Sequence, residues 1–281
     1  MRTVSSETII QEVKRLCLQA SCQLPKDVLD AIAAKEQTEK SVPGKSILGE
    51  MMKNASIASN ENLPLCQDTG VVVIFVELGT EVKIEGGLIY EALTEGVRQG
   101  YKEHYLRKSL VKDPLFNRVN TGDNTPPIMH VELVPGDKIT IHLAPKGGGS
   151  ENMSQQRMLK PYQGKEGVVD LVLETVIKSG GNACPPLVVG VGIGGNLEHS
   201  CFLAKKALLR KVGTKHPDPN YAAFEAELLE KINATGLGPS GLGGTTTAIA
   251  VHVLSHPCHI ASLPVAVNLN CNSARHASVT I

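Results

Sequence analysis

Apolar residues recur with a helical period near the start of the chain. Ile9, Val13 and Leu16 fall on one helical face, and a serine at position 5 or 6 can cap that helix. Pro25 suits the first turn of a second helix. A third helix is expected from about residue 46 to just before residue 60. The pattern predicts that the N-terminal sixty residues are helical.

Beyond residue 60, strand-like runs alternate with helical patterns and glycine-rich loops. Residues 71–78 and 187–195 are apolar runs that predict buried strands, and residues 259–269 form another that leads to Cys271. Apolar and polar positions alternate on both sides of Pro135-Gly136-Asp137, which predicts a β-hairpin. Further helices are expected over residues 88–105, 168–178, 198–211 and 221–233. We therefore expect an α+β (mixed) fold in one domain, residues 1–281, with residues 1–60 helical and residues 61–281 mixed.

The composition argues against several classes of partner. Lys plus Arg equals Asp plus Glu at 28 each, so no net charge favours nucleic acid or a membrane surface. The chain has no Trp and few aromatic residues, which argues against nucleic-acid binding by base stacking. No apolar run approaches the ~20 residues that span a bilayer, and the polar N-terminus is unlike a secretion signal. Seven cysteines, an odd number, indicate the reducing cytoplasm.

Three of the cysteines lie in polar loops beside the expected strands. Cys66 is in LPLCQDTG, Cys184 in GGNACPPL and Cys271 in NLNCNSARH. Loops at strand ends are where a rigid sheet can aim chemical groups at one point. The wide separation of these thiols, without any CxxC pair, suits an iron–sulfur cluster bound after folding. Three thiolates would leave one iron open as a Lewis acid, but three buried apolar cysteines are the alternative.

The other four cysteines are expected to be structural. Cys17 and Cys201 fall inside expected helices, in or near the core, and Cys22 lies at a helix end. Cys258, in HPCH, is the only rival ligand.

Polar residues near these loops are candidates for substrate binding. Gln67 and Asp68 follow Cys66 directly, although Asp68 can instead cap its own loop in an Asx-turn. The run KGGGS at residues 146–150 can form a backbone nest for an anion, and a carboxylate fits better than a phosphate because the GxxxxGK[ST] spacing is absent. His259 is either a core histidine or a site residue. Arg107 and Arg275 are candidates for bidentate carboxylate binding.

The motifs CQDTG, KGGGS, NACPP, GLGGTTT, HIAS and NCNSARH, in this order, resemble those of class I fumarases and L(+)-tartrate dehydratases. These are iron–sulfur hydro-lyases, and the resemblance to their alpha component covers nearly the whole chain. It implies a [4Fe–4S] cluster on Cys66, Cys184 and Cys271. It also implies that Asp68 and His259 take part in catalysis. The substrate-binding residues it implies are Gln67, Gly149 and Arg107, of which Arg107 reaches in from a neighbouring subunit.

Single-chain members of this family carry a second domain with the catalytic base and further carboxylate-binding residues, and this sequence lacks it. We therefore expect the alpha subunit of a two-subunit enzyme, with a separate beta subunit, as a dimer of alpha–beta pairs. The expected reaction is reversible hydration of fumarate to L-malate, with L(+)-tartrate to oxaloacetate as the alternative. A non-catalytic metal-binding scaffold and a nucleotide-binding enzyme that uses KGGGS or GIGGN are remoter alternatives.

Overall fold

The computed structural model describes residues 1–281, which divide into two compact units. Unit 1 comprises Met1–Pro25, Ala55–Gly148 and Arg275–Ile281, and unit 2 comprises Lys26–Asn54 and Gly149–Ala274. Each unit contains helices and a four-stranded sheet, so the predicted α+β (mixed) class is confirmed. No helix has the length and apolar character needed to cross a membrane.

Two helices of unit 1 pack tightly against each other. Helix α1 (Ser6–Cys22) is capped by Ser5, whose hydroxyl accepts a hydrogen bond from the Thr8 amide, as the sequence predicted. Helix α4 (Ile89–Glu103) lies against it. A Cβ at Gly96 would lie 2.6 Å from the Cβ of Val13, so the glycine is what permits the close approach. The strands β1 (Arg2–Ser5) and β3 (Val82–Glu85) form a parallel pair beside these helices.

The main sheet of unit 1 has the order β10-β5-β2-β4. Its strands are β2 (Val71–Gly79), β4 (Ile128–Val134), β5 (Ile139–Lys146) and β10 (Ala277–Thr280). The predicted hairpin is wrong, because β2 lies between β4 and β5, parallel to the first and antiparallel to the second. Strand β2 is apolar along most of its length, so it is buried best with a neighbour on both edges.

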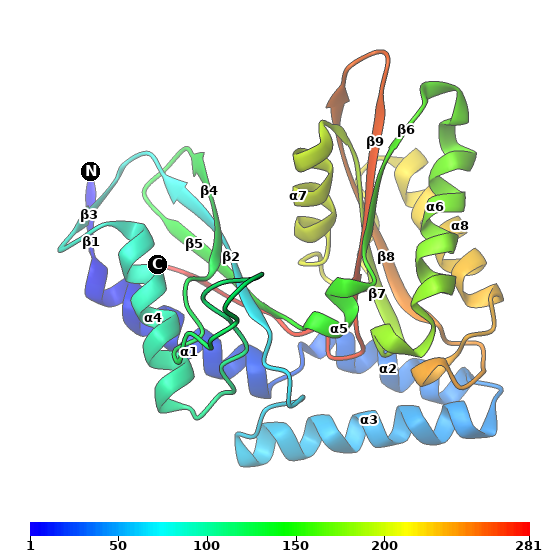
Figure 1. Ribbon diagram of the computed structural model, residues 1–281, viewed down its shortest axis with the longest axis horizontal. Coiled ribbons are helices and arrows are strands. Elements are labelled where there is room, and N and C mark those ends of the chain that lie inside the picture. Colours follow the sequence, from blue (N-terminus) through cyan, green and yellow to red (C-terminus); the bar gives the residue numbers. More distant parts are fainter. The chain divides into compact units, whose positions relative to one another are not determined.

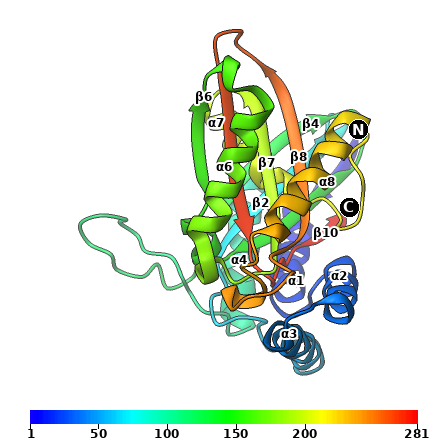
Figure 2. The same ribbon diagram turned by 90° about the vertical axis from the view of Figure 1, so that its right-hand side faces the viewer.

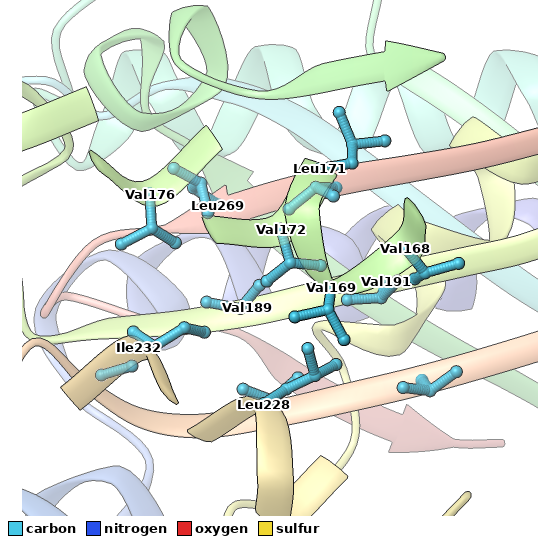
Figure 3. Packing of buried hydrophobic residues seen from close by; sticks show 14 of the residues in the cluster. Val168, Val169, Leu171, Val172, Val176, Val189, Val191, Leu228, Ile232 and Leu269 are labelled. Carbon is cyan, nitrogen blue, oxygen red and sulfur yellow. The ribbon is translucent and has the colours of Figure 1, made fainter. Parts of the chain in front are cut away.

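The sheet of unit 2 has the order β6-β9-β7-β8. Its strands are β6 (Gln155–Leu159), β7 (Leu187–Gly195), β8 (Ala248–Cys258) and β9 (Leu263–Asn270). Helices α6 (Gly164–Ser179) and α8 (Pro219–Ala234) cover one face, and α7 (Leu197–Ala207) covers the other (Figures 1 and 2). Figure 3 shows the core on the α6 and α8 side, where Val172 and Leu228 meet strand residues such as Val189.

Helix α7 rests directly on the backbone of β7. A Cβ at Gly190 would lie 2.1 Å from the Ala204 carbonyl oxygen, and one at Gly192 would lie 2.0 Å from that of Ser200. Glycines two residues apart point to the same face of a strand, so this face of β7 has no side chains at the contact.

Several remaining elements match the expected ranges only partly. Helix α2 (Lys26–Thr38) follows Pro25 as predicted, and α3 (Val42–Glu61) begins earlier than expected. The division between the units falls within α3. The KGGGS run spans the end of β5, at Lys146, and the start of a short helix, α5 (Gly148–Asn152). Strands β6 and β10 were not predicted, because their short polar sequences carry no strand period.

Candidate functional site

The candidate site residues are divided between the two units. Unit 1 carries Cys66, Gln67, Asp68 and Arg107, and unit 2 carries Gly149, Cys184, His259 and Cys271. In neither unit do three or more His, Cys, Asp or Glu side chains form a group that could hold a metal ion. Each unit therefore presents part of the predicted set.

The loop after Cys66 is held by three buried side chains, which we call the carbonyl clamp. The Asp68 carbonyl oxygen accepts a hydrogen bond from Arg275 Nη2, and that of Thr69 accepts one of 2.6 Å from the Tyr101 hydroxyl. The next carbonyl oxygen, of Gly70, accepts from Asn124 Nδ2 at 3.1 Å. Arg275, Tyr101 and Asn124 are each at most 3% exposed. Three successive peptide groups are thus fixed by side chains from three distant segments.

The Asp68 carboxylate links this loop to the start of α5. Its Oδ1 accepts a hydrogen bond of 2.9 Å from the Gly70 amide, and Oδ2 accepts one of 2.7 Å from the Gly148 amide. The first bond is the Asx-turn that the sequence left open. The hydroxyl of Ser109 lies 3.4 Å from Oδ1. The loop that carries Arg107 also contacts the loop after Cys66, because the Arg107 carbonyl oxygen accepts a hydrogen bond of 2.5 Å from the Thr69 hydroxyl.

Arg275 places a buried positive charge beside the Cys66 loop. Its Nε donates to the Pro145 carbonyl oxygen at 3.2 Å, Nη2 donates to that of Asp68, and Nη1 is buried without a partner. Both hydrogen-bond partners are main-chain carbonyl oxygens, and none is a carboxylate. Burial raises the pKa of the nearby Cys22 thiol and Tyr101 hydroxyl, and the Arg275 charge opposes both shifts. The sequence suggested carboxylate binding for Arg275, but two of its donor nitrogens hold main-chain carbonyl groups.

Two cysteine loops meet in unit 2. The Cys184 carbonyl oxygen accepts hydrogen bonds from the main-chain amide of Asn272 at 3.0 Å and from its side-chain amide at 2.9 Å. Cys271 is therefore followed directly by the residue that is hydrogen-bonded to Cys184. Cys184 is exposed and Cys271 is half-buried. A Cβ at Gly149 would lie 3.3 Å from the Asn182 carbonyl oxygen, so Gly149 also lies against the Cys184 loop.

His259 lies elsewhere in unit 2. It is in the turn between β8 and β9, and β9 begins only at Leu263. Its Nδ1 accepts a hydrogen bond of 3.1 Å from the Ala261 amide, and its carbonyl oxygen accepts one of 2.9 Å from the Ser262 amide. Because Cys271 follows the other end of β9, the structure does not bring His259 and Cys271 together.

The remaining cysteines are outside these loops, and none of the seven forms a disulfide. Cys17 is buried, as expected, and Cys22, at the end of α1, is buried too; burial raises the pKa of both thiols. Cys201 is exposed on α7, so its predicted place in the core is wrong, because the helix turns this position toward solvent. Cys258 is exposed next to His259.

Sequence reasoning missed Tyr101 and Asn124. A tyrosine on an amphipathic helix has the pattern of any core residue, and Asn124 lies in a loop whose TGDNTPP sequence indicates only turns. The one available signal is that a buried tyrosine usually finds a hydrogen-bond acceptor.

Comparison with known proteins places these features in a family. The profile of the family described as "Fumarate hydratase (Fumerase)" matches residues 10–280. A Methanocaldococcus jannaschii protein named "Putative L(+)-tartrate dehydratase subunit alpha" is 42% identical over 271 residues, which cover 94% of each chain. The L(+)-tartrate dehydratase subunit alpha of Escherichia coli strain UTI89 is 36% identical over 93% of this chain and 86% of its own length. The match extends over nearly the whole chain, confirms the resemblance seen in the motifs, and shows that the chain belongs to the fumarate hydratase family of hydro-lyases.

Proposed function

We propose that this chain is the alpha subunit of an iron–sulfur hydro-lyase that removes water from, or adds it to, a four-carbon dicarboxylate. Cys66, Cys184 and Cys271 would hold a [4Fe–4S] cluster. The observation that carries this proposal is where the cysteines lie. These three are in polar loops at strand ends and are at least partly accessible, whereas Cys17 and Cys22 are buried in α1, Cys201 is on helix α7 and Cys258 is the last residue of β8.

The donor set fits such a cluster. Cys184 and Cys271 come from two loops that Asn272 joins, so these two loops lie together although they are far apart in the sequence. Cys66 starts a loop whose peptide groups are held before any ligand binds. Iron–sulfur clusters are held by Cys thiolates, and a set of three leaves one iron without a protein ligand. When bound, the cluster supplies a Lewis acid for the substrate hydroxyl group.

The chain's own residues would bind and orient the substrate. Asp68 is held by the Gly70 and Gly148 amides, so its remaining lone pairs have a fixed direction and can orient the substrate hydroxyl group by accepting its hydrogen bond. The side-chain amide of Gln67 would donate a hydrogen bond to the same hydroxyl group. Gly149, which has no side chain, lets a carboxylate approach the main-chain amide. Arg107 would pair with a substrate carboxylate in a neighbouring subunit's site.

A separate beta subunit would complete the enzyme. Both relatives described above are named as alpha subunits, which supports a partner polypeptide. We assign the catalytic base and the remaining carboxylate-binding residues to that partner, and the assembly to a dimer of alpha–beta pairs. The isolated chain should then turn over either acid negligibly, because contacts remote from the reacting carbon position it for reaction.

Fumarate with L-malate is the first substrate pair, and L(+)-tartrate is the second candidate because the relatives carry that name. The test is anaerobic co-expression with the beta subunit, iron loading, and assay of fumarate hydration and tartrate dehydration in parallel. We expect turnover of one acid, a brown colour, and loss of activity in air that ferrous iron and a reductant restore. A loaded pair that acts on neither acid would contradict the proposed reaction. Full activity of the chain alone would contradict the two-subunit assignment.

A further inference from the structure

The run GLGPSGLGGTTT, residues 236–247, joins α8 to β8, and the proposed function gives it no role. We call it the glycine loop. Its two halves touch through their main chains. The Gly243 amide donates a hydrogen bond of 2.8 Å to the Leu237 carbonyl oxygen, and a Cβ at Gly238 would lie 2.2 Å from the Gly243 carbonyl carbon. Because the loop is packed on itself, a contact at one end can fix the position of the other end.

One end of the glycine loop rests on Glu39, the residue that follows α2. The Glu39 carboxylate is buried, and it accepts a hydrogen bond of 2.9 Å from the Thr245 amide and one of 3.1 Å from the Thr245 hydroxyl. A Cβ at Gly244 would lie 2.8 Å from Glu39 Oε1. The Lys40 and Ser41 amides donate to the same oxygen, at 2.8 and 2.9 Å. The carboxylate thus joins the glycine loop to the turn between α2 and α3, which lies beside it in Figure 1.

The other end of the glycine loop contacts the Cys184 loop. The Ser240 amide donates a hydrogen bond of 2.9 Å to the Pro185 carbonyl oxygen. A Cβ at Gly181 would lie 2.8 Å from the Ser240 carbonyl oxygen, and one at Gly241 would lie 2.6 Å from Gly181 Cα. The two main chains therefore meet closely, and the position of one sets that of the other.

Each of these two loops holds a non-glycine residue in the left-handed conformation. Cys184 has φ 53° and ψ 64°, and Ser240 has φ 53° and ψ 14°. This conformation is unfavourable for residues with a Cβ, and it persists only where the surrounding structure imposes it. The direction of the Cys184 Cα–Cβ bond, and with it the position of the thiol, therefore depends on the contacts around the loop. The Ser240 amide supplies one of them and Asn272 supplies another.

We propose that Glu39 is a positioning residue for the Cys184 thiol and acts through the glycine loop. The inference rests on the proposed function, in which Cys184 is a cluster ligand. The carboxylate fixes Thr245, the packed loop carries that position to Ser240, and Ser240 holds the carbonyl group of Pro185, the residue after Cys184. Without the carboxylate, the Thr245 amide loses its acceptor and that end of the loop is released. Cys184 then leaves its left-handed conformation more often, and a ligand without a fixed direction binds iron less tightly.

Amide hydrogen exchange in the iron-free chain tests this coupling directly. In Glu39→Ala, the Ser240 and Cys184 amides, which are both hydrogen-bonded, should exchange about tenfold faster. Glu39→Gln, which keeps one acceptor oxygen, should give a smaller increase. Val168→Ala is the matched control, because it removes core packing near the end of α6 that is remote from the Cys184 loop. It should leave both amides unchanged. Unchanged exchange in Glu39→Ala, or an equal increase in Val168→Ala, would overturn the proposal.

A second measurement follows the cluster in the reconstituted enzyme with its beta subunit. The chelator concentration that removes half of the iron should fall about tenfold in Glu39→Ala, by less in Glu39→Gln, and not at all in Val168→Ala. Wild-type resistance to the chelator in Glu39→Ala would overturn the positioning role. If the wild-type enzyme takes up no iron while exchange of the Cys184 amide still rises in Glu39→Ala, the proposed function fails and the coupling of Glu39 to the Cys184 loop stands.

Discussion

The cysteine loops of the two units are held in different ways. In unit 1, the peptide groups after Cys66 are held by the buried side chains of the carbonyl clamp, which come from distant segments. In unit 2, the Cys184 carbonyl oxygen is held by Asn272, which is the neighbour of Cys271, and the Pro185 carbonyl oxygen accepts a hydrogen bond of 2.9 Å from the Ser240 amide. The first loop depends on buried side chains from distant segments, and the second depends mainly on the loops beside it. Substitutions far from the thiols should therefore act on the Cys66 loop more strongly.

The largest effect is expected from replacing the three candidate cysteine ligands, and the effect should be equal for the cysteines of the two units. Replacing Cys66, Cys184 or Cys271 with Ser should abolish cluster binding, because two thiolates do not hold the cluster. Iron and sulfide content and visible absorbance after anaerobic reconstitution measure this. Cys201→Ser, at an exposed position on α7, is the control and should load normally. Full iron content in any of the three Ser variants would remove that cysteine from the set.

Arg275→Met should give the next largest effect, and it is specific to unit 1. The Asp68 and Pro145 carbonyl groups lose their donors, at a cost of about 1–3 kcal/mol each. A shift of the Cys66 loop by about 1 Å should lower kcat roughly 100-fold. Amide hydrogen exchange of residues 66–70 in the iron-free chain should rise as well. Arg275→Lys, which keeps the charge, should retain more activity. Unchanged exchange in the Met variant would show that Arg275 is not a positioning residue.

Acid should weaken unit 2 through Glu39. Burial acts to raise the pKa of its carboxyl, but hydrogen bonds from the Ser41 and Thr245 amides outweigh this and lower the pKa to about 2. The lowered pKa stabilises the fold fully above pH 4.5, and this stability is lost as the pH falls from 4.5 toward about 2. Glu39→Gln should reduce the free energy of unfolding by about 2 kcal/mol at pH 7 and flatten its acid dependence. Denaturant unfolding at pH 7 and pH 3 measures both. Equal acid dependence in the variant and the wild type would contradict this role.

Asn272→Ala should have a smaller effect, confined to the Cys184 loop. The Cys184 carbonyl oxygen loses the side-chain donor and keeps the main-chain one, so the free energy of unfolding should fall by about 1 kcal/mol. Alkylation of the Cys184 thiol by iodoacetamide in the iron-free chain should become faster, while that of Cys66 stays the same. Equal acceleration at both thiols would show that the two loops are not held independently.

Tyr101→Phe should give an effect no larger than that of Asn272→Ala, because only the hydroxyl group is lost. The Thr69 carbonyl oxygen loses one donor, and the free energy of unfolding should fall by about 1 kcal/mol. Tyr90→Phe, at a half-exposed position on the same helix, should cost much less. Thermal denaturation of the pair of variants, followed by circular dichroism, compares them directly. A larger loss for Tyr90→Phe would mean that the clamp hydroxyl contributes little.

Local patterns predicted much of the secondary structure and the cysteine loops. Helices such as α1 and α6 have long periodic faces, and the polar sequences around Cys66 and Cys184 indicate loops at strand ends. The hairpin failed because strand pairing depends on what else competes for an edge. Strand β2, from an earlier part of the chain, takes the place between β4 and β5.

Contacts between segments that are distant in the chain could not be predicted from the sequence. Nothing in the local pattern of Tyr101 or Asn124 shows that each donates to the loop after Cys66, because the donors and acceptors are more than thirty residues apart. The position of His259 depended on one turn. HIASLPVAVNL has the composition of one strand, but the bonds of His259 to Ala261 and Ser262 make its first residues a turn.

The glycines of β7 fix the position of this strand against α7 in unit 2. Because α7 rests on Gly190 and Gly192 without intervening side chains, the strand cannot slide by one residue without driving a Cβ into the helix backbone. The Cys184 loop precedes this strand, and the His259 turn lies beside its other end, where Gly195 pairs with Cys258. The distance from the Cys184 loop to the His259 turn is therefore set by the number of residues in β7. Any insertion or deletion in β7 would change it in steps of about 3.3 Å, so the strand tolerates changes of side chain far better than changes of length.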